Sequence, residues 1–239
     1  VIGDRVRAKI MKMKKNYGFA RLMEVLTPSP DRVEPLCPVA RQCGGCQIQA
    51  MSYEAQLAFK TRKVESNLKR IGKFEEIPME SIIGMEDPFH YRNKAQFPFG
   101  KNRDGKIITG FYAGRTHSII ENTSCHLGKE VNEEILEKIL AWMNAFHVEP
   151  YNEATGKGLM RHSLIRCGFR TGEIMVCLVI NGRKIPGEEA LVDSLKIIPG
   201  MTSISLNVNK EKTNVILGRE VINLWGRPYI EDYIGEVKY

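Results

Sequence analysis

Three cysteines within ten residues constrain this chain more than any other feature. They stand in Cys37-Pro-Val-Ala-Arg-Gln-Cys43-Gly-Gly-Cys46, spaced by five residues and then by two. Two intervening residues form a tight turn that lets two thiolates face one centre, and glycine suits such a turn because it reaches positive φ without steric cost. Three thiolates make an incomplete metal or cluster site, so a fourth ligand is expected downstream. The best candidate is Cys125, in a polar segment between two better-patterned stretches.

Cysteine usage and composition favour a reduced, cytoplasmic protein. Six cysteines in 239 residues, three of them clustered beside Gly-Gly, do not resemble a small secreted disulfide scaffold. No apolar run approaches the length of a membrane span, and the N-terminus shows no signal-peptide pattern. We therefore expect a cytoplasmic protein without membrane contact, large enough for one or two domains.

Positive charge gathers in two segments. The chain carries a net charge of +7, which points to a polyanionic partner. Residues 1–32 contain eight Lys or Arg against three acids, and residues 90–118 contain six against one. The helical stretches are close to balanced. Basic side chains on strands and loops are typical of a surface that grips a phosphate backbone.

The first segment predicts a small β-hairpin. Residues 5–10 alternate apolar and basic side chains, which predicts a half-buried strand with a basic outer face, and residues 16–22 predict a turn and a second strand. Aromatic residues interleaved with lysines can stack bases while the cations hold phosphates. Equally, the aromatic side chains can belong to a core and the lysines can solvate an edge strand. Both interpretations stay open. Two strands do not make an independent domain, so the first part of any barrel is expected to be absent from the chain.

Residues 52–71 predict an amphipathic helix. Ser52 is a suitable N-cap and Gly72 a suitable stop. One apolar stripe follows the 3.6-residue period: Tyr53, Leu57, Val64, Leu68 and Ile71. Such a stripe is usually a packing face.

The remaining residues, 87–239, predict an α+β domain. Helices are expected near 129–146 and 187–196, among strands that are mostly linked by hairpins, so we expect an antiparallel sheet. Asn102-Arg-Asp-Gly105 is a strong hairpin signal. The expected strands lie near 94–99, 106–113, 117–120, 161–170, 173–180, 202–208 and 213–217.

Several residues invite a catalytic interpretation that their context does not support. The loop at 155–158 lacks the spacing and the Ser or Thr of a P-loop, and no Gly-x-Gly-x-x-Gly follows a strand, so no dinucleotide or S-adenosylmethionine pocket is visible. His162 can be a base or a ligand, but a histidine at the start of a strand is more often structural or a phosphate contact. Cys167 and Cys177, expected to face each other across a turn, are predicted to be buried free thiols and not nucleophiles.

The cysteine motif and its surroundings resemble the bacterial iron–sulfur RNA (uracil-5-)-methyltransferases, and more narrowly the 23S ribosomal-RNA branch that carries an N-terminal TRAM domain. The resemblance covers nearly the whole chain, including the closing segment 226–232. It rests on the cysteine motif followed by Gln47-x-Gln49, on Tyr53-x3-Leu57-x2-Lys60, on Tyr91-Arg92-Asn93-Lys94 and on Cys125. It implies that a [4Fe–4S] cluster is held by Cys37, Cys43, Cys46 and Cys125.

The resemblance also implies a division of labour. In the family, a TRAM domain is a small OB-type barrel that helps a central domain to bind folded ribosomal RNA. The product of the family's reaction is 5-methyluridine. The implied segments are half of a TRAM domain (1–30), a cluster-binding loop (31–50), a helical segment that packs on a catalytic domain (51–86) and a central RNA-recognition domain (87–239). The expected RNA contacts are Lys14, Lys15, Tyr17, Phe19, Arg92, Lys94, Arg103, Arg161 and Arg166.

The family's Rossmann-like catalytic domain is expected only after Tyr239. That domain supplies the S-adenosylmethionine pocket, the cysteine that adds to the uracil and the base that removes a proton. We therefore assign no catalytic residue here and expect the 239-residue fragment to be inactive by itself. Helix 53–71, without the domain on which it packs in the family, is expected to support a dimer.

Two other classes remain open. One is a non-enzymatic nucleic-acid-binding module with a four-cysteine zinc or iron–sulfur site, although a spacing of five residues is unusual for zinc. The other is a redox-active radical enzyme, whose Cys-x3-Cys-x2-Cys pattern differs from this one. We expect the cluster to be structural support for an RNA-binding surface, with redox sensing as the alternative.

Overall fold

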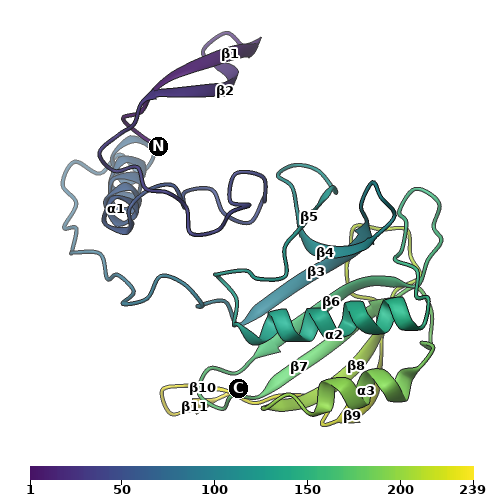
Figure 1. The fold of residues 1–239 in the computed structure, drawn as a ribbon. Coiled ribbons are helices and arrows are strands. Elements are labelled where there is room, and N and C mark those ends of the chain that lie inside the picture. The colour runs from purple at the N-terminus through teal and green to yellow at the C-terminus, as the bar shows by residue number, and fades with distance from the viewer. The chain divides into compact units, whose positions relative to one another are not determined.

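The computed structural model describes all of residues 1–239 and divides into two units (Figure 1). The first unit comprises residues 1–40 and 46–88, and the second comprises residues 41–45 and 89–239. None of the three helices combines the length and the apolar character that crossing a membrane would require.

The first unit contains an antiparallel hairpin and one helix. These elements are β1 (Arg5–Met13), β2 (Gly18–Thr27) and α1 (Tyr53–Arg70). Every residue of β1 is exposed, and all but one of β2 are exposed as well. The predicted half-buried strand is therefore wrong: a lone two-stranded hairpin has no second layer on which to bury its apolar face. The OB-type barrel stays a prediction.

Helix α1 begins where the sequence predicts. The Oγ of Ser52 accepts a hydrogen bond from the backbone N–H of Ala55 at 3.3 Å, which confirms the N-cap. The apolar stripe is only partly covered. The hydroxyl of Tyr53 accepts a hydrogen bond from the backbone N–H of Met85 at 2.6 Å, whereas Val64 and Ile71 are exposed.

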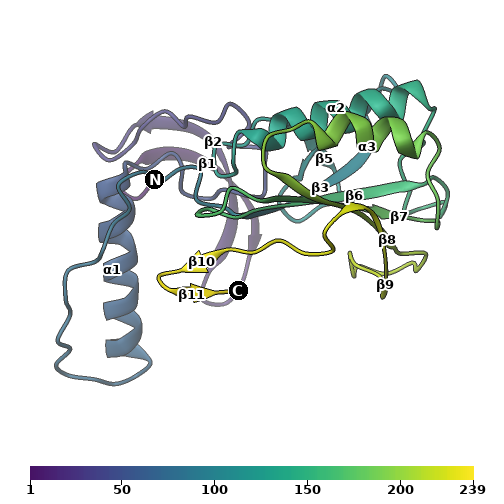
Figure 2. The same ribbon diagram turned by 90° about the horizontal axis from the view of Figure 1, so that it is seen from below.

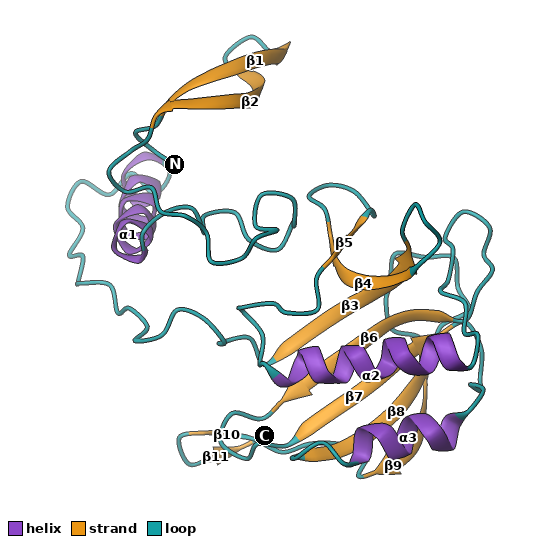
Figure 3. Cartoon of the chain, in the orientation of Figure 1, coloured by secondary structure: helices purple, strands orange, loops and turns teal.

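The second unit is built on one seven-stranded sheet with the order β5-β4-β3-β6-β7-β8-β9. Helices and strands are interspersed along the chain (Figure 3), which confirms the α+β prediction. The elements are β3 (Lys94–Lys101), β4 (Ile107–Tyr112), β5 (Ile119–Glu121), α2 (Val131–Ala145), β6 (Met160–Cys167), β7 (Ile174–Ile180), α3 (Glu188–Lys196), β8 (Met201–Val208), β9 (Glu220–Gly226), β10 (Tyr233–Ile234) and β11 (Val237–Lys238).

The sheet is mixed, so the expectation of a purely antiparallel sheet is wrong. β7 and β8 run parallel, with Ile174 opposite Met201 and Ile180 opposite Val208. The reason is α3, which lies between these strands in the chain. A helical crossover returns the chain to the end of the sheet where β7 began, and the next strand must then run in the same direction.

The core lies between this sheet and its two helices. α2 and α3 cover the same face of the sheet (Figure 2). The helical period predicts five inward residues on this helix: Val131, Ile135, Ile139, Met143 and Phe146. Ile135, Ile139 and Met143 are fully buried and pack in one cluster with side chains from β3, β6, β7, β8 and α3, and Val131 is partly buried against it, but Phe146 at the end of the helix is exposed. Trp142 is also buried, and its Nε1 donates a hydrogen bond to the carbonyl of Pro186 at 3.0 Å.

The strand expected at 213–217 is replaced by a loop, and β9 begins only at Glu220. Two buried asparagines explain the difference. The Nδ2 of Asn209 donates to the carbonyls of Val215 and Ile216, both at 2.8 Å, and the Oδ1 of Asn207 accepts from the N–H of Gly218 at 2.6 Å. These side chains satisfy the backbone groups that a neighbouring strand would otherwise satisfy.

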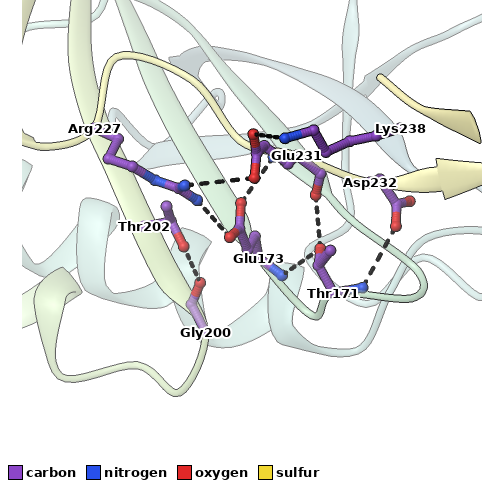
Figure 4. A network of polar contacts seen from close by, with 8 residues as sticks. All are labelled: Thr171, Glu173, Gly200, Thr202, Arg227, Glu231, Asp232 and Lys238. Atoms are coloured by element: carbon purple, nitrogen blue, oxygen red, sulfur yellow. Dashed lines mark hydrogen bonds and ion pairs between the residues drawn. The ribbon is translucent and has the colours of Figure 1, made fainter.

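The C-terminal segment is fastened to the turn between β6 and β7 by a polar network (Figure 4). The carboxylate of Asp232 accepts hydrogen bonds from the backbone N–H groups of Phe169 at 2.7 Å and Arg170 at 2.9 Å. Glu173 pairs with Arg227 and accepts the N–H of Glu231 at 2.8 Å. Burial alone would raise the pKa of Asp232, but the backbone N–H donors outweigh it and lower that pKa to about 2.

Candidate nucleic-acid interface and cysteine ligands

Two of the four predicted ligands lie in the first unit and are linked by one glutamine. The backbone N–H of Cys37 donates to the Oε1 of Gln49 at 3.0 Å, and the Nε2 of Gln49 donates to the Sγ of Cys46 at 3.9 Å. Gln49 therefore holds the backbone of one cysteine and the sulfur of the other. A donor aimed at a cysteine sulfur favours the thiolate form that a metal ligand needs.

The other two predicted ligands belong to the second unit. The Sγ of Cys43 accepts a hydrogen bond from the N–H of Gly45 at 3.3 Å, and the N–H of Gly44 donates to the carbonyl of Tyr112 at 2.9 Å. A Cβ on Gly44 would lie 2.9 Å from that carbonyl oxygen, so glycine is needed for this close approach. The carbonyl of Cys125 accepts the N–H of Gly128 at 2.9 Å in a tight turn.

All six cysteines are free thiols. Within neither unit do three or more His, Cys, Asp or Glu side chains form a group that could hold a metal ion. The cluster and its ligands accordingly stay a prediction.

The remaining two cysteines are buried free thiols, as expected, and burial raises the pKa of Cys167 to about 11 and raises the pKa of Cys177 too. They do not face each other, because Cys167 lies opposite Ile174 and Cys177 opposite Leu164.

Two predicted RNA contacts meet on the sheet. Lys94 on β3 lies directly opposite Arg166 on β6, and both side chains are exposed. Directly opposed residues of antiparallel strands project from the same face, so two cations are neighbours there. Like charges in this position repel each other unless an anion lies between them. Arg92 lies just before β3 and is half-buried, with its N–H bonded to the carbonyl of Leu127 at 2.8 Å.

The β1–β2 turn brings another four predicted contacts together. The rings of Tyr17 and Phe19 lie 5.5 Å apart in an edge-to-face arrangement, and both are exposed. Lys14 and Lys15 stand in the same exposed turn, which is closed by a bond from the N–H of Lys14 to the carbonyl of Tyr17 at 2.7 Å. These side chains are available to a ligand, and the two aromatic rings are not packed in a hydrophobic core.

Arg161 is removed from the set of expected contacts. Only 6% of the residue is exposed, and its guanidinium donates to the carbonyls of Asn209 at 2.9 Å and Glu211 at 2.8 Å. It also lies over the ring of Tyr151. Arg161 thus stabilises the loop after β8. The sequence does not predict this burial, because Arg161 stands beside His162 near the start of a strand, where a basic side chain is usually exposed. Arg103, in contrast, is exposed at the β3–β4 turn.

His162 is structural. It is buried, and desolvation, with the nearby charge of Arg161, lowers its pKa to about 4, so the imidazole is neutral at pH 7. Its Nε2 lies 3.4 Å from the hydroxyl of Tyr112, and the ring of Tyr112 stacks on that of His117. The sequence patterns do not single out Tyr112 or His117, because they stand apart in the chain and follow no motif.

Opposed exposed cations and an exposed lysine–aromatic turn are typical of a surface that binds nucleic acid. The chain is 44% identical over 240 residues to an "uncharacterized RNA methyltransferase" of Clostridium tetani, covering 100% of this chain and 52% of that relative. A relative of the same description from Clostridium acetobutylicum is 45% identical over 242 residues, with 100% and 52% covered. One from Listeria monocytogenes is 43% identical over 237 residues, with 99% and 52% covered. The chain therefore spans about half the length of the curated relatives it matches. No family model matches.

A solved structure shares the fold. It is the crystal structure of Pyrococcus abyssi tRNA (uracil-54, C5)-methyltransferase in complex with S-adenosyl-L-homocysteine. The TM-score is 0.71 at 24% sequence identity, and the match covers 97% of this chain and 50% of that one. At this identity the likeness establishes the fold alone.

Proposed function

We propose that this chain is the RNA-recognition part of an RNA (uracil-5-)-methyltransferase. The observation that carries the proposal is the sequence identity of 43–45%, along essentially the whole chain, to proteins described as RNA methyltransferases. That similarity does not favour the alternative of a non-enzymatic module.

The exposed basic side chains support the RNA-binding half of the proposal. Lys94 and Arg166 form a pair of neighbouring cations that a bridging phosphate would stabilise, and Lys14 and Lys15 flank two exposed aromatic rings that can stack on bases. We propose S-adenosylmethionine as the methyl donor of the whole protein. The thiols of Cys167 and Cys177 are poor candidates for the nucleophile, because both are buried and burial raises their pKa values.

The target is proposed to be 23S ribosomal RNA, with 5-methyluridine as the product and residues 1–30 acting as part of a TRAM domain. These finer assignments follow the resemblance of the cysteine motif and its flanking residues. A cytoplasmic location is part of the same proposal.

Four cysteines are proposed to hold a [4Fe–4S] cluster: Cys37, Cys43, Cys46 and Cys125. The donor set fits such a group, because all four are free thiols and the sulfurs of Cys43 and Cys46 each accept an N–H hydrogen bond. When bound, the cluster would supply a cross-link between segments distant in the chain. Gln49 and Gly45 would stabilise the thiolate charge, and we propose no redox role.

Deletion of the gene that encodes this chain tests the function. Ribosomal and transfer RNA from the deletion strain and its parent would be separated, digested to nucleosides and quantified by mass spectrometry. We expect 5-methyluridine to fall in 23S ribosomal RNA, to stay constant in transfer RNA, and to return on complementation. If 5-methyluridine fell only in transfer RNA, the substrate would be transfer RNA and not 23S ribosomal RNA. Unchanged 5-methyluridine in both fractions would contradict the proposal.

A further inference from the structure

A cavity of about 780 Å³ lies in the second unit, beside the edge of the sheet formed by β3, β4 and β5. Its walls come from the end of β3, from β4, from the residues that enter β5 and from the loop at 149–154. The volume is within the range of about 300–1,000 Å³ typical of small-molecule sites. None of the four predicted cysteine ligands lines this cavity, and of the expected RNA contacts only Arg103 does.

One ring in this cavity is both exposed and fixed. The side chain of His117 is 57% exposed, yet its ring stacks on Tyr112 with the centroids 5.0 Å apart and the planes 19° from parallel. Its Nδ1 lies 2.7 Å from a carboxylate oxygen of Glu153. Tyr112 is in turn positioned by the contact between its hydroxyl and the buried His162. One face of the imidazole is therefore covered, and the other remains available to a planar ligand.

The rest of the cavity suits a nucleotide. Phe99, Ile108 and Ile119 provide apolar wall, and Arg103 at the β3–β4 turn forms no ion pair with any carboxylate. The neighbouring Lys101 is neutralised by Glu149 at 2.7 Å, so Arg103 is the cation free to meet a phosphate. A ring that is already immobilised loses little side-chain entropy when a base stacks on it.

We propose that this cavity takes one unpaired nucleobase of an RNA strand, which stacks on the outer face of His117 while Arg103 contacts an adjoining phosphate. The inference rests on the proposed function, because it assumes that RNA is the substrate. Base stacking on aromatic side chains, histidine included, is the usual way in which proteins hold splayed-out bases of single-stranded RNA.

The test is the affinity of the purified chain for fluorescein-labelled rA10, measured by fluorescence anisotropy. His117→Asn removes the stacking ring, and the matched control His147→Asn changes an exposed histidine outside the cavity whose positive φ asparagine tolerates. We expect His117→Asn to weaken binding by about 5- to 100-fold, as for loss of one base stack. We expect His117→Phe to retain affinity within about threefold, and His147→Asn to match the unmodified chain.

An abasic decamer of the same length separates base stacking from phosphate binding. We expect the unmodified chain and His117→Asn to bind it equally. If His117→Asn lost affinity equally for rA10 and for the abasic decamer, or lost no affinity for rA10, the proposed base pocket would be overturned. The RNA-binding role of the chain would not be affected by either result. Displacement of rA10 by an equal concentration of AMP would overturn it in favour of a free nucleotide. Absence of rA10 binding by every variant would overturn it too, while the nucleoside analysis of the deletion strain would still decide the methyltransferase function.

Discussion

Replacement of Asp232 by Asn tests how the C-terminal segment is held on the second unit. Asp232 is 5% exposed, and its carboxylate accepts backbone N–H groups from Phe169, Arg170 and, at 3.4 Å, Thr171. Asn keeps the size of the side chain and one acceptor oxygen. It loses the negative charge and places an N–H₂ group where backbone N–H groups already converge.

The expected loss of stability is estimated from the two short hydrogen bonds that the Asp232 carboxylate accepts, at 2.7 and 2.9 Å. A neutral hydrogen bond contributes about 1 kcal/mol to stability and a charge-assisted one roughly twice that. Loss of the charge should therefore cost about 1–2 kcal/mol, once screening by solvent at the turn is allowed for. The pKa of Asp232 in the folded state is about 2, below the ordinary 3.8. Its stabilisation is thus complete above about pH 5 and is lost as the pH falls through 3.8 toward 2.

Urea unfolding followed by tryptophan fluorescence measures this effect, because both tryptophans, Trp142 and Trp225, lie in the second unit. We expect Asp232→Asn to be less stable by about 1–2 kcal/mol at pH 7, and the difference to shrink by about half at pH 3. Asp104→Asn, at the exposed β3–β4 turn, is the matched control and should stay within about 0.5 kcal/mol of the unmodified chain. A loss of stability for Asp232→Asn that is the same at pH 7 and pH 3 would show that the negative charge of Asp232 does not stabilise the fold.

Three further outcomes are expected. Chain purified without oxygen should carry about four irons and absorb at about 400 nm, and Cys125→Ser should lose both, whereas Cys177→Ser should keep them. One bound zinc without colour would instead favour a zinc module. Ile139→Ala, at a fully buried position of α2, should lower the free energy of unfolding in urea by about 2–5 kcal/mol. A smaller decrease would mean that neighbouring core side chains fill the space left by the shortened side chain. If the exposed stripe of α1 supports a dimer, light scattering should show it and Val64→Glu should dissociate it; a monomer before substitution would contradict that expectation.

Local signals in the sequence predicted much of the fold. Ser52 caps α1, and the hairpin at 102–105 forms with its Asn side chain bonded to the N–H groups of Asp104 and Lys106, both at 3.0 Å. The helical period places Ile135, Ile139 and Met143 in the core. In these places one residue or one period decides the structure, so a sequence pattern is enough.

Other features depend on partners far away in the chain. The parallel pairing of β7 with β8 depends on how α3 crosses the sheet, and the loop at 213–217 depends on two asparagines that precede it by several residues. Arg161 and Lys94 are indistinguishable as basic residues at the start of a strand. The fold buries Arg161 against carbonyls 48 and 50 residues away and leaves Lys94 exposed opposite Arg166. The group of Tyr112, His117 and Glu153 could not be predicted for the same reason.

The salt dependence of RNA binding shows whether Lys94 and Arg166 contact RNA phosphates. The dissociation constant of the purified chain for a 23S ribosomal RNA transcript would be measured from about 50 to 200 mM salt, for the unmodified chain, Lys94→Gln and Arg166→Gln. Lys196→Gln on α3 is the control, since that lysine already pairs with Asp193 at 2.6 Å. We expect Lys94→Gln and Arg166→Gln each to lower the slope of log K against log salt by about 1, and Lys196→Gln to leave it unchanged. Equal slopes for all four proteins, or no binding of the transcript, would contradict this expectation.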